Sequence, residues 1–112
     1  MKAILIIMLI FYSTNKTPEI GMASWYGPGF HGRKTASGVL YDQNKMVAAH
    51  KSLPFGTIIK VTNLSNNISV DVKVVDRGPY SKGRIVDVSS KAADILKFKH
   101  KGTTKVKIEK IN

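Results

Sequence analysis

Two stretches in the second half of the chain alternate strictly between apolar and polar residues. From Ser69 to Val75 the apolar positions on one face are valines, and from Thr104 to Lys110 they are Val106 and Ile108. A period of two residues is that of a β-strand with one face buried and the other toward solvent. We therefore predict a strand over each stretch, with these apolar side chains inside.

Shorter apolar runs, separated by glycine, proline and polar residues, predict further strands. The expected strands are Met22–Tyr26, Met46–Ala49 and Ile58–Thr62. The stretch Phe30–Gly38 is rich in glycine and small polar residues and is expected to form a loop. A turn is expected from Leu53 to Gly56, and a polar turn is expected from Asn63 to Asn67.

One helical pattern lies between the two alternating stretches. Ser89 or Ser90 can cap its N-terminus, and we expect it to end near Phe98. Together, about six short strands and one helix predict a mainly β protein with a closed or nearly closed barrel, in a single domain over residues 21–112. The apolar face of the helix is expected to comprise Ala92, Ala93, Ile95 and Leu96.

The N-terminus has the pattern of an export signal. Lys2 supplies a positive charge, and Ala3 to Tyr12 is an unbroken apolar run of ten residues, whereas a membrane-spanning helix needs about 20. An uncleaved anchor and a buried first strand are the alternatives, because no Ala-x-Ala cleavage site follows. We predict that residues 1–20 are a signal peptide and linker, and that the domain acts in the periplasm or cell envelope.

The charge balance favours an anionic partner. Eighteen Lys and Arg against seven Asp and Glu give a formal net charge of +11, which attracts nucleic acid, anionic lipid or anionic wall polymers. A merely soluble, lysine-rich surface is the alternative. The lysines are spread along the chain, which argues against a nucleic-acid-binding arm. The absence of cysteine excludes disulfides, a cysteine nucleophile and a cysteine metal site.

Asp76 is a candidate for acid–base chemistry. It ends an apolar strand and precedes Arg77, Gly78 and Pro79. Partial removal from water helps a carboxylate to hold a proton, as a general acid must. Arg77 acts in the opposite sense, but neighbouring side chains of an extended chain point to opposite faces. The alternative is a structural aspartate that bonds to its own turn.

A second aspartate and a pair of aromatic residues could also contribute to a site. Asp87 follows Ile85-Val86 and precedes the helix, where it could equally be a helix-entry or buried structural carboxylate. Trp25 and Tyr26 are neighbours on a strand, so one ring can pack inward while the other is exposed to stack on a sugar, although either could be a core residue.

The histidines are candidate acids, bases or hydrogen-bonding groups. His31 and His50 lie in or beside the predicted loops, and His100 is expected to be solvated among lysines. Their spacing to carboxylates matches no metal site, and no nucleophile elbow or phosphate-binding loop is present. The sequence therefore predicts neither a metal nor a cofactor.

Several short motifs, weak singly, form a specific ordered set. The motifs are Ala23–Gly27, Lys34–Gly38, Ala48–Thr57, Val61–Leu64, Asp76–Tyr80 and Gly83–Ser89. In this order and spacing they resemble the rare lipoprotein A family over about Met22 to Phe98, most of the chain outside the predicted signal.

The resemblance implies a six-stranded double-psi β-barrel and an endolytic lytic transglycosylase that cleaves peptidoglycan between N-acetylmuramic acid and N-acetylglucosamine. Such an enzyme leaves 1,6-anhydro ends without consuming water. Asp76 matches the family's general acid and base, and His50, Trp25 and Tyr26 match residues of the substrate groove. We also expect Arg77 and Asp87 to contact the substrate.

The sequence departs from the family's pattern at Val39. Many members have a catalytic glutamate after the glycine equivalent to Gly38, and valine cannot transfer a proton; Asp42 could partly replace it. Loss of such a supporting group costs roughly 10²–10⁴-fold in rate. A non-catalytic, expansin-like wall-binding barrel is therefore the alternative. Many members also have a lipid-modified cysteine after the signal and a separate glycan-binding repeat, whereas this sequence contains no cysteine and ends with the predicted barrel.

The expected partner is the peptidoglycan glycan strand, bound by a monomer. A membrane contact is expected only through the N-terminal export segment. A basic nucleic-acid binder is disfavoured, because export would separate the protein from that ligand.

Overall fold

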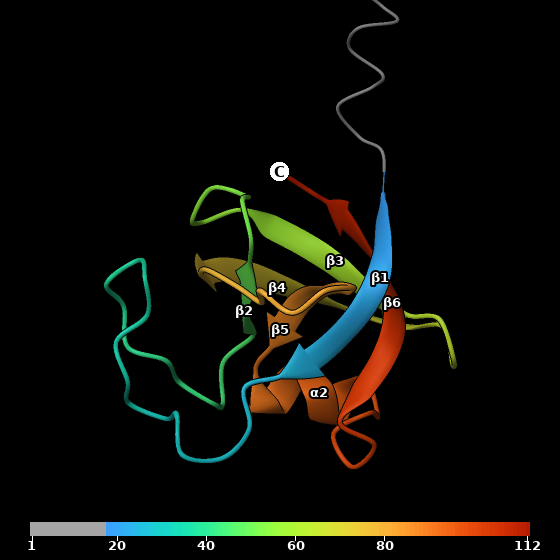
Figure 1. Cartoon of the computed structure of the whole chain (residues 1–112), viewed down its shortest axis with the longest axis horizontal. Helices are drawn as coiled ribbons and strands as arrows, with labels where there is room; N and C mark the ends of the chain where they lie inside the picture. The colour runs from blue at the N-terminus through green and yellow to red at the C-terminus, as the bar shows by residue number, and fades with distance from the viewer. Residues whose placement is uncertain (1–17) are drawn as a thin grey trace, which may run out of the picture.

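The computed structural model describes residues 18–112, so the predicted export signal lies almost wholly outside it. Within that range six strands close into a barrel in the order β1-β5-β2-β4-β3-β6 (Figure 1). β1 is parallel to β5 and β2 is parallel to β4, while the other neighbours are antiparallel. The strands are β1 (Glu19–Trp25), β2 (Val47–His50), β3 (Ile58–Asn63), β4 (Ile68–Asp76), β5 (Arg84–Val88) and β6 (Thr103–Lys110).

Between β5 and β6 lies the short helix α2 (Ser90–Ile95). The predicted class, a mainly β six-stranded barrel with one short helix, is confirmed for the described part of the chain. No helix within residues 18–112 is long and apolar enough to cross a membrane.

The alternating strands enclose the core as predicted. In β4 the side chains of Val70, Val72 and Val74 are buried, whereas Asp71 and Lys73 are exposed. Val106 and Ile108 of β6 are buried in the same cluster. Each fully buried valine stabilises the fold by about 1.5–3 kcal/mol relative to an exposed one. The barrel interior is therefore filled with side chains, and a ligand must bind on its outer surface or at its ends.

Several strand boundaries differ from the sequence-based prediction, and two of the differences have a clear structural cause. β1 begins at Glu19 rather than Met22, because Glu19 and Ile20 pair with β6. Asn63 was expected in a polar turn, but it ends β3 and is only 2% exposed. Its side-chain Nδ2 donates to the carbonyl oxygen of Leu96 at 2.8 Å, and its Oδ1 accepts from Thr104 Oγ1 at 3.0 Å. Asn63 therefore joins the end of the helical segment to β3 and β6.

The helix is shorter than predicted. Ser89 caps it, because its Oγ accepts from the backbone N–H of Ala92 at 3.3 Å. It ends at Ile95 rather than near Phe98, since Lys97 takes a left-handed conformation with φ of 62°. The prediction that Ile95 belongs to the apolar face is wrong: its side chain is 42% exposed. A helix of six residues buries one narrow stripe, here Ala92, Ala93 and the capping residue Leu96.

Candidate active site

Asp76 stands at the end of β4, partly buried, and its carboxylate accepts three hydrogen bonds. Oδ1 accepts from the backbone N–H groups of Ala36 at 2.8 Å and Arg77 at 2.9 Å. Oδ2 accepts from the hydroxyl of Tyr26 at 2.7 Å. Only the bond to Arg77 is the local turn contact expected of a structural aspartate. The other two come from distant segments, so the fold holds this carboxylate in one orientation.

A tight turn brings Ala36 to Asp76. Thr35 donates to the carbonyl oxygen of Val39 through both its backbone N–H (2.8 Å) and its Oγ1 (2.7 Å). Gly38 has a φ of 97°, which favours glycine, and its N–H bonds to the carbonyl of Thr35 at 3.0 Å. The N–H of Ser37 bonds to the carbonyl of Val75 at 3.1 Å. The predicted loop is thus a hairpin whose tip is fastened to the end of β4.

Tyr26 reaches Asp76 from beyond the end of β1. Its ring stacks on Tyr41, with centroids 4.2 Å apart and an angle of 11° between the planes, and meets the edge of Phe30 at 6.1 Å. Burial, together with the nearby carboxylate of Asp76, raises the pKa of Tyr26 above its ordinary value. The phenol therefore stays protonated and remains a hydrogen-bond donor to Asp76.

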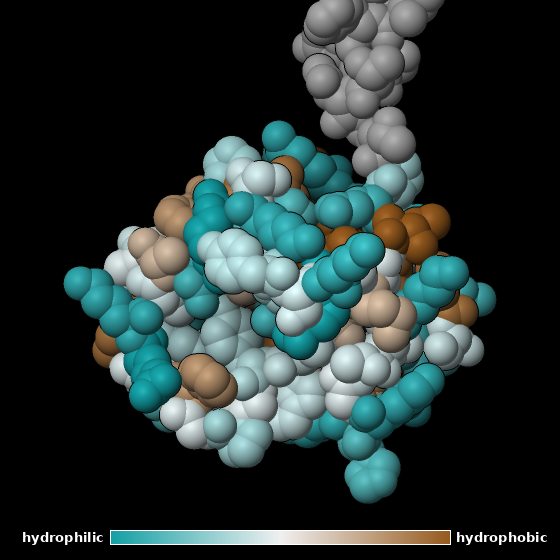
Figure 2. Space-filling model, viewed as in Figure 1, coloured by the Kyte–Doolittle hydropathy of each residue, from teal (hydrophilic) through white to brown (hydrophobic). Residues whose placement is uncertain are grey.

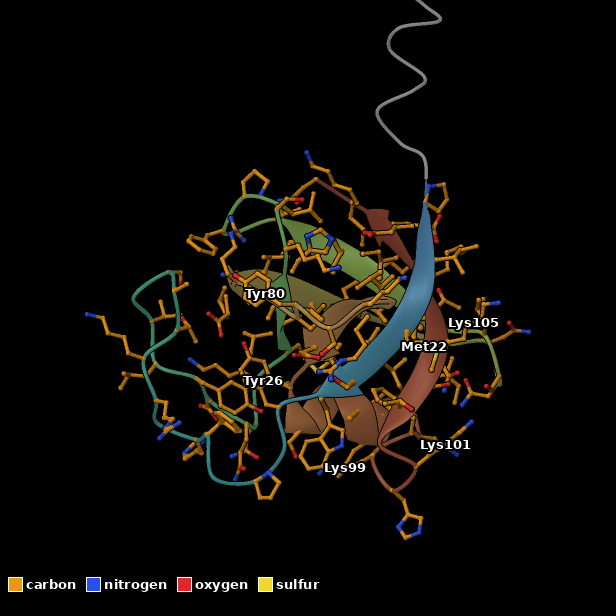
Figure 3. The ribbon with its side chains drawn as sticks, viewed as in Figure 1. Met22, Tyr26, Tyr80, Lys99, Lys101 and Lys105 are labelled. Carbon is orange, nitrogen blue, oxygen red and sulfur yellow. The ribbon has the colours of Figure 1, made fainter. Side chains whose placement is uncertain are left out.

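Asp76 and Tyr26 line an open pocket of about 210 Å³ between the barrel and the loop. The face drawn in Figure 2 is hollowed between the barrel and this loop, and hydrophilic side chains border the hollow. Figure 3 shows Tyr26 on this side of the molecule, together with Tyr80 from the connection between β4 and β5. Tyr80 is 79% exposed. The remaining residues of the pocket are Phe30, Arg33, Lys34, Thr35 and Tyr41.

Arg77 points away from the carboxylate of Asp76. Its guanidinium lies over the ring of Phe55, 4.1 Å from the centroid, and Nη1 donates to the carbonyl of His50 at 3.3 Å. Among residues 18–112, no ion pair joins Arg77 to Asp76. The guanidinium and the exposed edge of Phe55 form a small platform beside Asp76.

Asp87 occupies the same row of the barrel as Asp76 but is engaged differently. Ala49 of β2 pairs with Asp76 on one side and with Asp87 on the other, which puts the two aspartates about 10 Å apart in the backbone. Asp87 lies inside β5, not at the helix entry. Its Oδ1 accepts from Arg84 Nη2 at 2.8 Å and from the hydroxyl of Ser24. The ion pair with Arg84 lies within β5 and leaves Asp87 22% exposed, whereas the bond from Ser24 links β5 to β1.

His50 is buried, and its ring is fully used by contacts within the fold. Nδ1 accepts from the backbone N–H groups of Ser52 and Leu53, both at 3.1 Å. Nε2 therefore carries the proton and donates to Glu19 Oε1 at 3.0 Å. The structure brings His50 together with the start of β1 and the turn after β2. Within residues 18–112, the side chain of His50 forms no hydrogen bond with Asp76.

The other predicted residues lie around the pocket rather than in it. Asp42 accepts from the backbone N–H of Asn44 at 2.9 Å and lies 3.9 Å from Nδ1 of His31. Trp25 packs against the core, with Lys99 5.2 Å above its ring, so of the aromatic pair it is Tyr26 that bonds to Asp76. His100 is exposed, as predicted.

Val39 is 51% exposed and does not line the pocket that contains Asp76. It borders a neighbouring hollow of about 490 Å³, together with Leu40, Met46 and Val75. Asp42 lies in that hollow as well. Within the described residues, no hydrogen bond or ion pair links Asp42 to Asp76, so the geometry gives no support to Asp42 as a second acid.

Sequence reasoning missed two parts of this site. One is Tyr41, which is 2% exposed and stacks on Tyr26. Its only signal in the sequence is that it is an aromatic residue at the end of the hairpin. The N–H of Ala36 was missed because a backbone donor has no side-chain signature. The position of the hairpin on β4 depends on contacts between segments 40 residues apart.

Residues 19–108 match the protein family described as lytic transglycolase. The chain belongs to this lytic transglycolase family. It is 56% identical over 101 residues to the endolytic peptidoglycan transglycosylase RlpA of Rickettsia felis, covering 88% of this chain and 44% of that protein. The RlpA of Campylobacter jejuni is 55% identical over 91 residues, covering 81% and 33%.

This lytic transglycolase domain therefore spans less than half the length of these two curated relatives. Two solved structures share its fold. The Streptomyces papain inhibitor has a TM-score of 0.67 at 17% identity, covering 86% of this chain and 96% of that one. The expansin of Clavibacter michiganensis in complex with cellohexaose has a TM-score of 0.68 at 19% identity, covering 86% and 51%. The likeness to expansin confirms the barrel fold predicted from the family resemblance.

Proposed function

We propose that this domain is an endolytic lytic transglycosylase that cuts the glycan strands of peptidoglycan, with Asp76 as its general acid and base. The observation that carries the proposal is the setting of Asp76, a partly buried carboxylate that faces an open pocket and is held by three donors from three segments. Relatives more than 50% identical carry the name of this activity, which also supports a location in the cell envelope.

The two carboxylate oxygens differ in their capacity to hold a proton. Oδ1 already accepts two backbone N–H bonds, whereas Oδ2 accepts only from Tyr26. A carboxylate oxygen offers about two acceptor sites. Oδ2 is therefore the oxygen with capacity left for the transferable proton. The Tyr26 hydroxyl fixes its direction relative to the pocket.

In the proposed reaction, Asp76 donates its proton to the glycosidic oxygen as the bond from that oxygen to the muramyl anomeric carbon breaks. The 6-hydroxyl oxygen of the same muramyl residue then bonds to the anomeric carbon, and its proton returns to Asp76. The products are a free hydroxyl on one fragment and a 1,6-anhydro end on the other. The carboxyl group is restored to its starting state, and no water enters the products.

We further propose supporting roles for the residues around the pocket. Tyr26 and the Arg77–Phe55 platform contact the glycan on either side of Asp76. His50 and Asp87 shape the groove through their bonds to β1 and the turn after β2, rather than by touching the sugar. The valine at position 39 lowers the rate, because it adds no second carboxylate near the reacting atoms.

Asp76→Asn tests the proposal with little disturbance to the fold. The amide oxygen can keep both backbone N–H bonds, and its NH₂ can donate to the Tyr26 hydroxyl in place of accepting from it. Asp71→Asn is the matched control, because Asp71 is an exposed carboxylate on the same strand. Digestion of purified sacculi should release anhydro-muropeptides with the wild type and Asp71→Asn, but not with Asp76→Asn. Equal release by all three proteins would refute the role of Asp76.

A non-catalytic polysaccharide-binding barrel is the second candidate. It is favoured by the valine at position 39 and by the likeness to an expansin solved with cellohexaose. Sedimentation with sacculi distinguishes the two functions. If the domain only binds, the wild type and Asp76→Asn should sediment with sacculi to the same extent. Neither protein should then release soluble fragments at any concentration.

A further inference from the structure

Tyr41 lies directly behind Tyr26 and is almost completely buried. Its ring is 2% exposed and stacks on Tyr26 with centroids 4.2 Å apart. Tyr26 in turn donates to Asp76. Removal of the Tyr41 ring would leave a space behind Tyr26, and an aromatic pair of this kind is worth about 0.5–1.5 kcal/mol beyond the area it buries. The orientation of the Tyr26 hydroxyl therefore depends on Tyr41.

The same residue also fixes the hairpin that supplies the second donor. The N–H of Tyr41 bonds to the carbonyl of Arg33 at 2.7 Å, and its carbonyl accepts from the N–H of Gly32 at 2.8 Å. These two bonds close the base of the hairpin whose tip carries Ala36. Loss of packing at position 41 would therefore displace both Tyr26 and the N–H of Ala36.

The Tyr41 hydroxyl ties this assembly to the barrel. It accepts from the backbone N–H of Ser90, the first residue of α2, at 3.1 Å. The loop that contributes Tyr41 extends away from the barrel on one side of the molecule (Figure 1). One buried ring thus connects the helix, the base of the loop and the aromatic residue that bonds to Asp76.

We propose that Tyr41 is a positioning residue for Asp76, which acts through Tyr26 and the hairpin and does not touch the substrate. This inference rests on the function proposed above. A displacement of about 1 Å in a catalytic group can cost on the order of 10²-fold in rate. Loss of the ring should therefore lower kcat, whereas KM should hardly change, because Tyr41 borders the pocket but is only 2% exposed and offers the glycan almost no surface.

Three variants separate positioning from general stability. Tyr41→Phe keeps the stacked ring and loses only the bond to Ser90. Tyr41→Leu keeps an apolar side chain and loses the stack. Tyr41→Met fills the space with a flexible chain and serves if the leucine variant does not fold. Kinetics on soluble glycan strands should show kcat lowered at least about tenfold for Leu or Met, with KM within about twofold, and Phe within about threefold of wild type.

Amide hydrogen exchange provides a readout that needs no catalysis. Ala36 is exposed, so its N–H is protected chiefly by the bond to Asp76, whereas the N–H of Val74 bonds to Thr57 within the barrel. Tyr41→Leu should speed exchange at Ala36 at least about tenfold and leave Val74 protected.

The two readouts give distinguishable outcomes. If the wild type releases no anhydro fragments, the proposed function fails, and the exchange rate at Ala36 alone decides whether Tyr41 positions the site. The positioning role is overturned if a folded Leu or Met variant keeps wild-type kcat and wild-type exchange at Ala36. It is also overturned if KM rises while kcat stays constant, since that result indicates direct contact with the glycan.

Discussion

The hydroxyl of Tyr26 donates a hydrogen bond of 2.7 Å to Oδ2 of Asp76, although the two residues are 50 positions apart. In the barrel, β1 and β4 are separated by β5 and β2. The bond therefore crosses two intervening strands. Tyr26 can reach Asp76 because it lies just beyond the end of β1 and its ring stacks on Tyr41. This contact fixes the one carboxylate oxygen that has capacity for a transferable proton.

Tyr26→Phe removes this donor and keeps the aromatic stack. A hydrogen bond to a charged group is worth about 1.5–3 kcal/mol, so we expect kcat to fall by roughly 10- to 100-fold. KM should change little, because the ring still lines the pocket. Tyr80→Phe is the control, since Tyr80 is 79% exposed. Steady-state kinetics on soluble glycan strands measure both constants, and an unchanged kcat for Tyr26→Phe would show that the donor has no catalytic role.

Stability should fall at alkaline pH because two tyrosines resist ionisation in the folded protein. Burial, and for Tyr26 also the carboxylate of Asp76, raises the pKa values of Tyr26 and Tyr41 above the ordinary 10. Above about pH 10 the unfolded chain loses these protons while the folded protein keeps them. The free energy of unfolding therefore decreases as the pH rises. Urea unfolding between about pH 9 and 11.5 should show a shallower decrease for Tyr26→Phe, and identical slopes would contradict this.

Val39→Glu should increase the rate of glycan cleavage. The position is 51% exposed on a hairpin fastened beside Asp76, so a longer polar side chain is tolerated, and its length is needed because Val39 borders the neighbouring hollow rather than the pocket of Asp76. A supporting carboxylate is worth on the order of 10-fold or more in acid–base catalysis. Leu40→Glu adds the same charge at a neighbouring position that is 65% exposed. If both variants match the wild type in anhydro-muropeptide release, the valine is not what limits the rate.

His50→Ala should act mainly on stability. It removes the acceptor of the Ser52 and Leu53 N–H groups and the donor to Glu19, which costs about 1–3 kcal/mol. His31→Ala, at an exposed position, should change the free energy of unfolding by no more than about 0.5 kcal/mol. Denaturant unfolding measures both. A His50→Ala protein of wild-type stability but greatly raised KM would instead place His50 in contact with the glycan.

The barrel could be predicted from sequence because its strands obey a simple period. The alternation of Val70, Val72 and Val74 with Asp71 and Lys73 predicts burial of one face, and the structure buries the three valines there. The errors fall where long-range contacts override local preference. Asn63 looked like a turn residue, but its amide satisfies the carbonyl of Leu96 from a distant segment. The helix likewise ends before Phe98, where the carbonyl of Leu96 accepts from the side chains of Asn63 and Asn66.

The site was only partly predictable. Asp76 and Tyr26 stand out through their motifs, and the structure brings them together. The roles of Tyr41 and the Ala36 N–H depend on where the hairpin lies on β4, which no local pattern encodes. His50 shows the opposite case, since its motif suggests a groove residue while its bonds run to Glu19 and the following turn.

Cleavage of sacculi in water enriched in ¹⁸O tests the central claim most directly. Mass spectrometry of the soluble fragments should show 1,6-anhydro ends that carry no ¹⁸O, because the muramyl 6-hydroxyl closes the ring and water is not a reactant. The same fragments should be absent with Asp76→Asn. Reducing ends labelled with ¹⁸O, or fragments that persist in Asp76→Asn, would contradict a lytic reaction driven by Asp76.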